Sequence, residues 1–137
     1  MFFNKKSTHF DTVESLKTAI ELYDRTIKRH SDDHNAVSLK ADALMKLCQL
    51  TGEDTYLNEA LNCYHLAIRI ASENALYFVN RATCYINLKQ DDLASADLEK
   101  AKSLLPTIDD VMVSAHIRSE VEKIEQYLSN TSRLTLG

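Results

Sequence analysis

The chain has 137 residues and a mass of 15.6 kDa, which is enough for one domain of ordinary size. It is 45% hydrophobic and 26% charged but has only two Gly and one Pro, so tight turns and phosphate-binding glycine loops are almost excluded and we expect a nearly all-helical chain. Sixteen basic and twenty acidic residues give a net charge of −4, which argues against a nucleic-acid partner because such binding relies on basic clusters.

The cysteines and the apolar runs predict the compartment. Cys48, Cys63 and Cys84 are an odd number spread along the chain, unlike the dense even set of a secreted disulfide scaffold. No run of about 18 apolar residues is present to span a bilayer, and residues 1–10 lack the apolar core of a secretion signal. We therefore expect a cytoplasmic protein without a membrane segment, in which residues 1–10 form a flexible N-terminal segment.

The first helix is predicted over residues 11–30. Asp11 and Glu14 have the spacing of a capping box, and Lys28 and Arg29 suit a helix C-terminus. Apolar residues recur at intervals of three and four, which is the period of one helix face. They are Val13, Leu16, Ile20, Tyr23 and Ile27.

Five further apolar stripes follow, beginning at Val37, Leu57, Phe78, Ala94 and Ile117. Short joints separate them, at 31–33, 51–54, 72–74, 90–92 and 106–107. Connections of this length make neighbouring helices antiparallel, so the pattern predicts helix hairpins. Thr107 and Asp110 have the spacing that would cap the last helix.

Small and aromatic residues repeat in a fixed frame. Positions at Ala60, Tyr64, Ala67 and Ser72 recur 34 residues later as Ala94, Leu98, Ala101 and Pro106. This period and these residue types resemble the tetratricopeptide repeat, best matched by residues 75–106. The chain departs from the repeat in having no Trp and a single Pro.

An earlier, degenerate copy begins at Ala19, 41 residues before Ala60, so seven residues are inserted between Leu47 and Leu57. Seven residues are about two helical turns, so we expect one extra turn on each helix of that hairpin, covered by Leu50 and Tyr56. Ala at the crossing points lets the paired helices approach closely.

The resemblance implies an all-α fold: a TPR-like α-α superhelix, a short solenoid of antiparallel helix hairpins with about two and a half repeats over residues 11–129. Residues 107–129 would be a C-terminal capping helix that covers the end of the stack. Residues 130–137 are expected to be a disordered tail. At the other end the first helix has no preceding partner, so either Phe2, Phe3 and Phe10 cover it or the chain forms a homo-oligomer there.

The resemblance also implies a concave binding face on the first helix of each hairpin, which in the family holds an extended or helical peptide. Apolar members of this face would bury a peptide side chain, and its amides would bond the peptide backbone. An equal alternative for Val79 and Ile86 is packing against the closing helix. The predicted face consists of Ser38, Asp42, Met45, Lys46, Leu76, Val79, Asn80, Thr83 and Asn87, with Asn35 and Ile86 beside them.

Some family members bind acidic chaperone tails through a clamp of Lys, Asn and Arg. Asn80 matches one clamp position. The other clamp positions, where the family has Lys, Asn or Arg, are occupied here by Ser38, Asp42, Asp110 and Ser114. A terminal carboxylate would meet carboxylates there, so this mode of binding is rejected.

No enzyme site is expected. His30 and His34 flank Asp32 and Asp33, but helix capping explains the aspartates better than a metal site does. Cys63 and His65 are two residues apart on a helix and cannot face one another. We therefore expect no catalytic residue, no metal and no cofactor.

The sequence thus predicts a non-enzymatic protein-protein interaction module that binds a peptide or a partner protein through its concave face. Two alternatives stay open: a helical-repeat chaperone of a bacterial secretion system, and a structural or oligomerising subunit of a larger complex.

Overall fold

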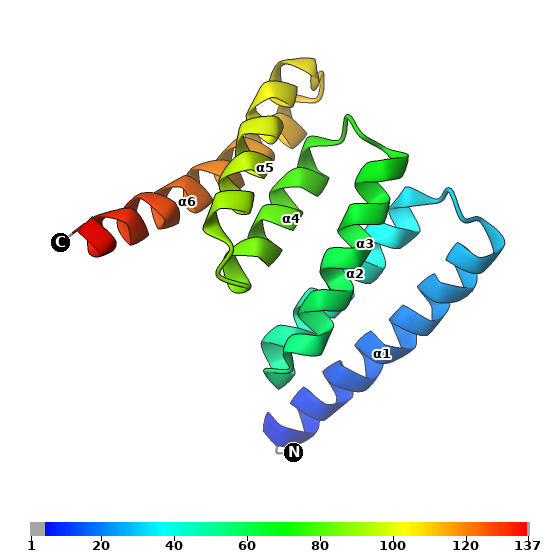
Figure 1. Ribbon diagram of the computed structural model, residues 1–137. Coiled ribbons are helices and arrows are strands. Elements are labelled where there is room, and N and C mark those ends of the chain that lie inside the picture. The colour runs from blue at the N-terminus through cyan, green and yellow to red at the C-terminus, as the bar shows by residue number, and fades with distance from the viewer. Residues whose placement is uncertain (1–4, 137) are drawn as a thin grey trace. The chain divides into compact units, whose positions relative to one another are not determined.

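The computed structural model describes the backbone of residues 5–136 and the side chains of residues 11–132. The elements are α1 (Lys5–Arg29), α2 (His34–Thr51), α3 (Asp54–Ile70), α4 (Ala75–Asn87), α5 (Asp91–Leu104), the short 3₁₀ helix η1 (Leu105–Thr107) and α6 (Val111–Leu136). Residues 5–136 contain no strand, so the prediction of an all-α chain is confirmed for that range (Figure 1). The contacts divide the chain into two compact units, residues 1–70 and 71–137.

The first unit is the α2–α3 hairpin with α1 packed against α2 (Figure 1). The alanines predicted to lie at the crossing of the paired helices, Ala41, Ala60 and Ala67, are completely buried. Leu44 and Tyr64 fill the space around them and are 1% and 2% exposed. The small residues therefore let α2 and α3 approach, and the large ones fill the remaining volume.

The turn between α2 and α3 depends on Gly52. Its φ of +74° is left-handed, and its N–H donates to the Cys48 carbonyl at 2.8 Å, which closes the end of α2. The helices on either side have 18 and 17 residues, against 13 and 14 in α4 and α5. Leu50 and Tyr56 are half-buried at this end. The expected lengthening of this hairpin is confirmed.

The second unit is the α4–α5 hairpin, against which α6 packs. Ala82, Ala94 and Ala101 are completely buried, as in the first unit. Asn74 caps α4, because its Oδ1 accepts a hydrogen bond from the Leu76 amide at 3.1 Å. The α6 stripe of Ile117, Val121 and Ile124 is buried, which agrees with a helix that covers the hairpin.

Two helix starts differ from expectation. The first helix begins at Lys5, so Asp11 lies inside it and is not its cap, because the helical pattern continues upstream of that residue. The cap of α6 is Asp110, whose Oδ1 accepts from the amides of Met112 and Val113 at 2.9 and 3.1 Å. Thr107 belongs instead to η1, a tighter turn that contains Pro106, and its hydroxyl donates to the Leu104 carbonyl.

The expected tail also differs, since residues 130–136 continue α6 and form its last turns. Residues 1–4 and 137 lie outside the described residues, as do the side chains of 5–10. The suggestion that Phe2, Phe3 and Phe10 cover the first helix therefore falls outside what the structure describes.

Candidate interaction surfaces

The predicted face of α2 is partly exposed. Lys46 and Asp42 are exposed and Met45 is half-buried, whereas Ser38 is buried, with 9% of its surface exposed. Lys46 makes no hydrogen bond or ion pair among the described residues. The accessible part of this face is therefore one carboxylate, one ammonium and part of a thioether side chain.

Asp42 is held in place by the second helix of its hairpin. The buried Tyr64 hydroxyl donates to Asp42 Oδ1 at 2.5 Å, a short bond of the kind that charged acceptors make. Burial of the carboxylate raises the pKa of Asp42 above its ordinary value, and the Tyr64 hydrogen bond offsets part of that rise. One oxygen of Asp42 is thus fixed, and the residue as a whole remains accessible.

The predicted face of α4 divides into a buried and an accessible part. Val79 is only 2% exposed and so belongs to the core of its unit, and Leu76, Asn80 and Thr83 are half-buried. The Thr83 hydroxyl donates to the Val79 carbonyl one turn earlier, at 3.2 Å. Asn87 is exposed, and the side chains of Asn87 and Asn80 have no hydrogen-bond partner in the described part of the chain.

A partly buried ion pair on α4 and α5 was not among the residues predicted from the sequence. Arg81 Nε and Nη2 donate to the two oxygens of Asp97 at 2.8 and 2.7 Å, and Asp97 is 5% exposed. The guanidinium also lies 5.5 Å from the ring centre of Phe78 and 5.8 Å from that of Tyr85. The hydrogen bond to Asp97 raises the pKa of Arg81 further. The overlooked signal was a carboxylate at position 97, inside the apolar stripe of α5.

In the first unit, an ion pair joins α1 and α2. Lys40 Nζ lies 2.6 Å from Asp24 Oδ1 and so joins α2 to α1. Burial raises the pKa of the nearby Cys63 thiol, and the charge of Lys40 only partly opposes that rise. Burial also raises the pKa of Cys48, and Cys84 is completely buried. A raised pKa leaves a smaller fraction of the Cys48 and Cys63 thiols as thiolate, the nucleophilic form, at neutral pH.

Asp33, one of the two aspartates between His30 and His34, caps a helix. Asp33 Oδ1 accepts from the Ala36 amide at 3.0 Å, as expected for the start of α2. Among the described residues, no group of three His, Cys, Asp or Glu side chains is placed to hold a metal ion. Across the same residues, no helix combines the length and apolarity needed to span a membrane.

Comparison with known proteins gives a partial match. No family model matches the chain. The chain is 38% identical over 74 residues to dynein axonemal assembly factor 4 of Pongo pygmaeus, and equally to those of Pan paniscus and Pan troglodytes. The match covers 51% of this chain but only 17% of each of those proteins, so the similarity concerns one segment of a much longer relative.

Proposed function

We propose that the chain is a non-enzymatic protein-interaction module whose two hairpins are tetratricopeptide-like repeats. The observation that carries this proposal is the complete burial of Ala60, Ala67, Ala94 and Ala101, two pairs of residues with a spacing of 34. A helix pair that meets through alanines at this period is the unit from which such repeats are built.

The partial similarity to an assembly factor supports a role in assembling other proteins. In that role the chain would hold a partner without changing its covalent structure, and we expect this to take place in the cytoplasm. The similarity covers a small part of the relative, so we do not propose that this chain acts on dynein, which appears in the relative's name.

We further propose that the partner contacts the first helix of each hairpin. The accessible residues there are Asp42 and Lys46 on α2, and Asn80 and Asn87 on α4. They combine charges of both signs with amides that donate and accept, which suits the backbone and polar side chains of a peptide. Ser38 on α2 and Val79 on α4 are buried, so each would contribute by packing within its own unit and not by touching the partner.

The test is affinity capture from native lysate with variants that leave the described contacts intact. Lys46→Glu combined with Asn87→Ala changes two exposed residues of the proposed face. Lys100→Glu combined with Asn62→Ala makes the same chemical changes on α5 and α3, the second helices of the hairpins, where both residues are also exposed. We expect the first variant to lose specific partners that the wild type and the control variant retain. Identical partner sets for all three proteins would contradict the assignment.

A further inference from the structure

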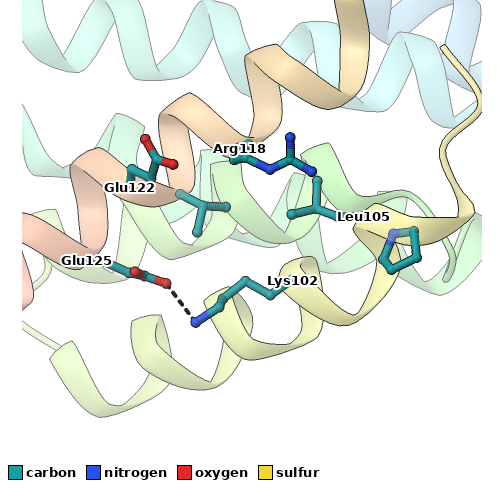
Figure 2. A pocket seen from close by; sticks show the side chains of 7 residues that line it. Lys102, Leu105, Arg118, Glu122 and Glu125 are labelled. Atoms are coloured by element: carbon teal, nitrogen blue, oxygen red, sulfur yellow. Dashed lines mark ion pairs between the residues drawn. The ribbon is translucent and has the colours of Figure 1, made fainter. Parts of the chain in front are cut away.

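A pocket of about 580 Å³ lies in the second unit, between the end of α5, η1 and the middle of α6 (Figure 2). Leu105 and Pro106 line it from one side and Val121 from the other. Val121 is 3% exposed, so the pocket reaches down to the core of the unit. A volume of this size accommodates one or two apolar side chains of a partner.

The charges around the pocket differ in whether they are already paired. Lys102 Nζ lies 2.8 Å from Glu125 on α6 and 3.4 Å from Glu99 on its own helix. Figure 2 shows Lys102 and Glu125 pointing toward one another, with Arg118 on the α6 side taking no part in that pair. Arg118 is exposed and makes no hydrogen bond or ion pair within the described part of the chain. It is therefore the pocket's unpaired cation.

The first two turns of α6 extend the pocket with an exposed apolar surface. Val111 is 78% exposed and the adjacent Met112 is 80% exposed, values far above those of the other large apolar residues of this unit. Intervals of four and three place Val111, Ala115 and Arg118 on one face of the helix, the face that leads to the pocket. Arg118 thus lies between the exposed Val111 and Ala115, which precede it on this face, and the pocket, whose accessible apolar residues are Leu105 and Pro106.

We propose that this surface, formed by Val111, Ala115, Arg118 and the pocket lined by Leu105, Pro106 and Val121, binds a partner segment in which a carboxylate lies between apolar side chains. The carboxylate pairs with the Arg118 guanidinium, which presents parallel donors that fit two carboxylate oxygens. One apolar side chain enters the pocket, and another covers Val111. This surface is on a different helix from the proposed peptide face of α2 and α4.

The carboxylate of Glu122, which also lines the pocket, should weaken the binding of an acidic segment. Glu122 is exposed, has no hydrogen-bond or ion-pair partner among the described residues, and lies one turn beyond Arg118. A bound carboxylate would be repelled by it. Removing that charge should strengthen binding, and reversing the charge of Arg118 should abolish it.

The experiment titrates two peptides into the full-length ¹⁵N-labelled protein and follows amide shifts. Both are acetylated, amidated heptapeptides, Ser-Leu-Leu-Asp-Leu-Leu-Ser and its counterpart with Asn in place of Asp. We expect the Asp peptide to shift amides of residues 102–106 and 111–125 and to bind about tenfold more tightly than the Asn peptide, since a bond to a charged group carries that much affinity. Arg118→Glu should remove the shifts, Glu122→Gln should strengthen binding, and Arg25→Glu, at an exposed position on α1, should leave binding unchanged.

Three results would overturn the proposal: no shifts in this region, equal affinity for the Asp and Asn peptides, or tighter binding of a Lys-for-Asp peptide. A protein dimer that forms without peptide and is dissolved by Arg118→Glu would also overturn it, because the occupant would then be a second copy of the chain. The amide spectrum of Arg118→Glu without peptide shows whether that variant is folded. Glu122→Gln provides an independent check that does not depend on it.

Discussion

Arg81 and Asp97 join α4 to α5 through two parallel hydrogen bonds of 2.8 and 2.7 Å, inside a hairpin in which Ala82, Ala94 and Ala101 are completely buried. Asp97 is 5% exposed, so removing its partner or the residue itself leaves a poorly solvated charge. The guanidinium also lies over the rings of Phe78 and Tyr85. This pair fixes the orientation of the two helices in a way that alanine contacts alone would not.

We expect Asp97→Ala to lower the free energy of unfolding by about 3 kcal/mol, because it leaves Arg81 without its acceptor. The double variant Arg81→Met, Asp97→Leu should recover most of that loss. Glu120→Ala, which breaks an exposed pair with Lys123, should cost less than about 0.5 kcal/mol. Urea denaturation measures all three, and a loss for Asp97→Ala no larger than for Glu120→Ala would contradict this view of the pair.

The buried alanines give a second prediction. Ala82 is completely buried on α4, so Ala82→Leu should overpack the hairpin and cost about 1 to 3 kcal/mol. Ala96 lies on α5 with its side chain exposed, and Ala96→Leu adds the same atoms without a clash. Thermal unfolding of both variants makes the comparison. Equal melting temperatures would mean that Ala82 is not a site of close helix approach.

Gly52 allows a test in which only the backbone matters. No atom lies within 4 Å of a Cβ added at this position, so the cost of Gly52→Ala comes from its φ of +74° alone. We expect a loss of about 1 kcal/mol, and a smaller loss for Gly52→Asn, since Asn adopts the left-handed conformation more readily. Chemical denaturation distinguishes the two variants. If Asn costs as much as Ala, the left-handed turn does not limit stability.

The raised pKa of Asp42 predicts a pH dependence. The folded chain binds a proton at this carboxyl more readily than the unfolded chain does, so the resulting stabilisation is fully present below the ordinary pKa of 3.8 and is lost as pH rises through the raised value. Asp42→Asn keeps an oxygen for the Tyr64 hydroxyl and cannot ionise. Its stability relative to wild type should therefore increase between about pH 3 and about pH 7.

Urea unfolding at several pH values measures this difference. Asp92→Asn, at an exposed position on α5, changes the net charge by the same amount and serves as the control. Two results would contradict this expectation: the stability of Asp42→Asn relative to wild type stays constant, or it falls with rising pH, when compared with this control. Either result would show that burial does not raise the pKa of the Asp42 carboxyl.

The helices and their buried faces were predictable where the helix period and the repeat period coincide. Ala60 and Ala94 recur with the helix period and the repeat period together, and both are completely buried. Helix ends were less predictable because several residues compete for the same role. Thr107 and Asp110 both have capping side chains, but Thr107 lies in the 3₁₀ turn Leu105–Thr107 and Asp110 accepts the amide hydrogen bonds of α6.

The site was predictable only in part, because exposure depends on contacts between helices. Val79 and Asn80 are neighbours on α4, yet one is buried and the other half-buried. The partners of Asp42 and Asp97 lie 22 and 16 residues away, and no local pattern connects them. The pocket beside Arg118 is formed by separate helices and has no signature in the sequence.

The claim that the first helices of the two hairpins hold a partner protein can be tested most directly by photo-cross-linking. A photoreactive amino acid replaces Lys46 or Asn87 in one pair of proteins and Asn62 or Lys100 in the control pair, and each is irradiated in native lysate. We predict that positions 46 and 87 cross-link to the same partner and that positions 62 and 100 do not. Cross-linking of that partner from 62 and 100, with none from 46 and 87, would contradict the account.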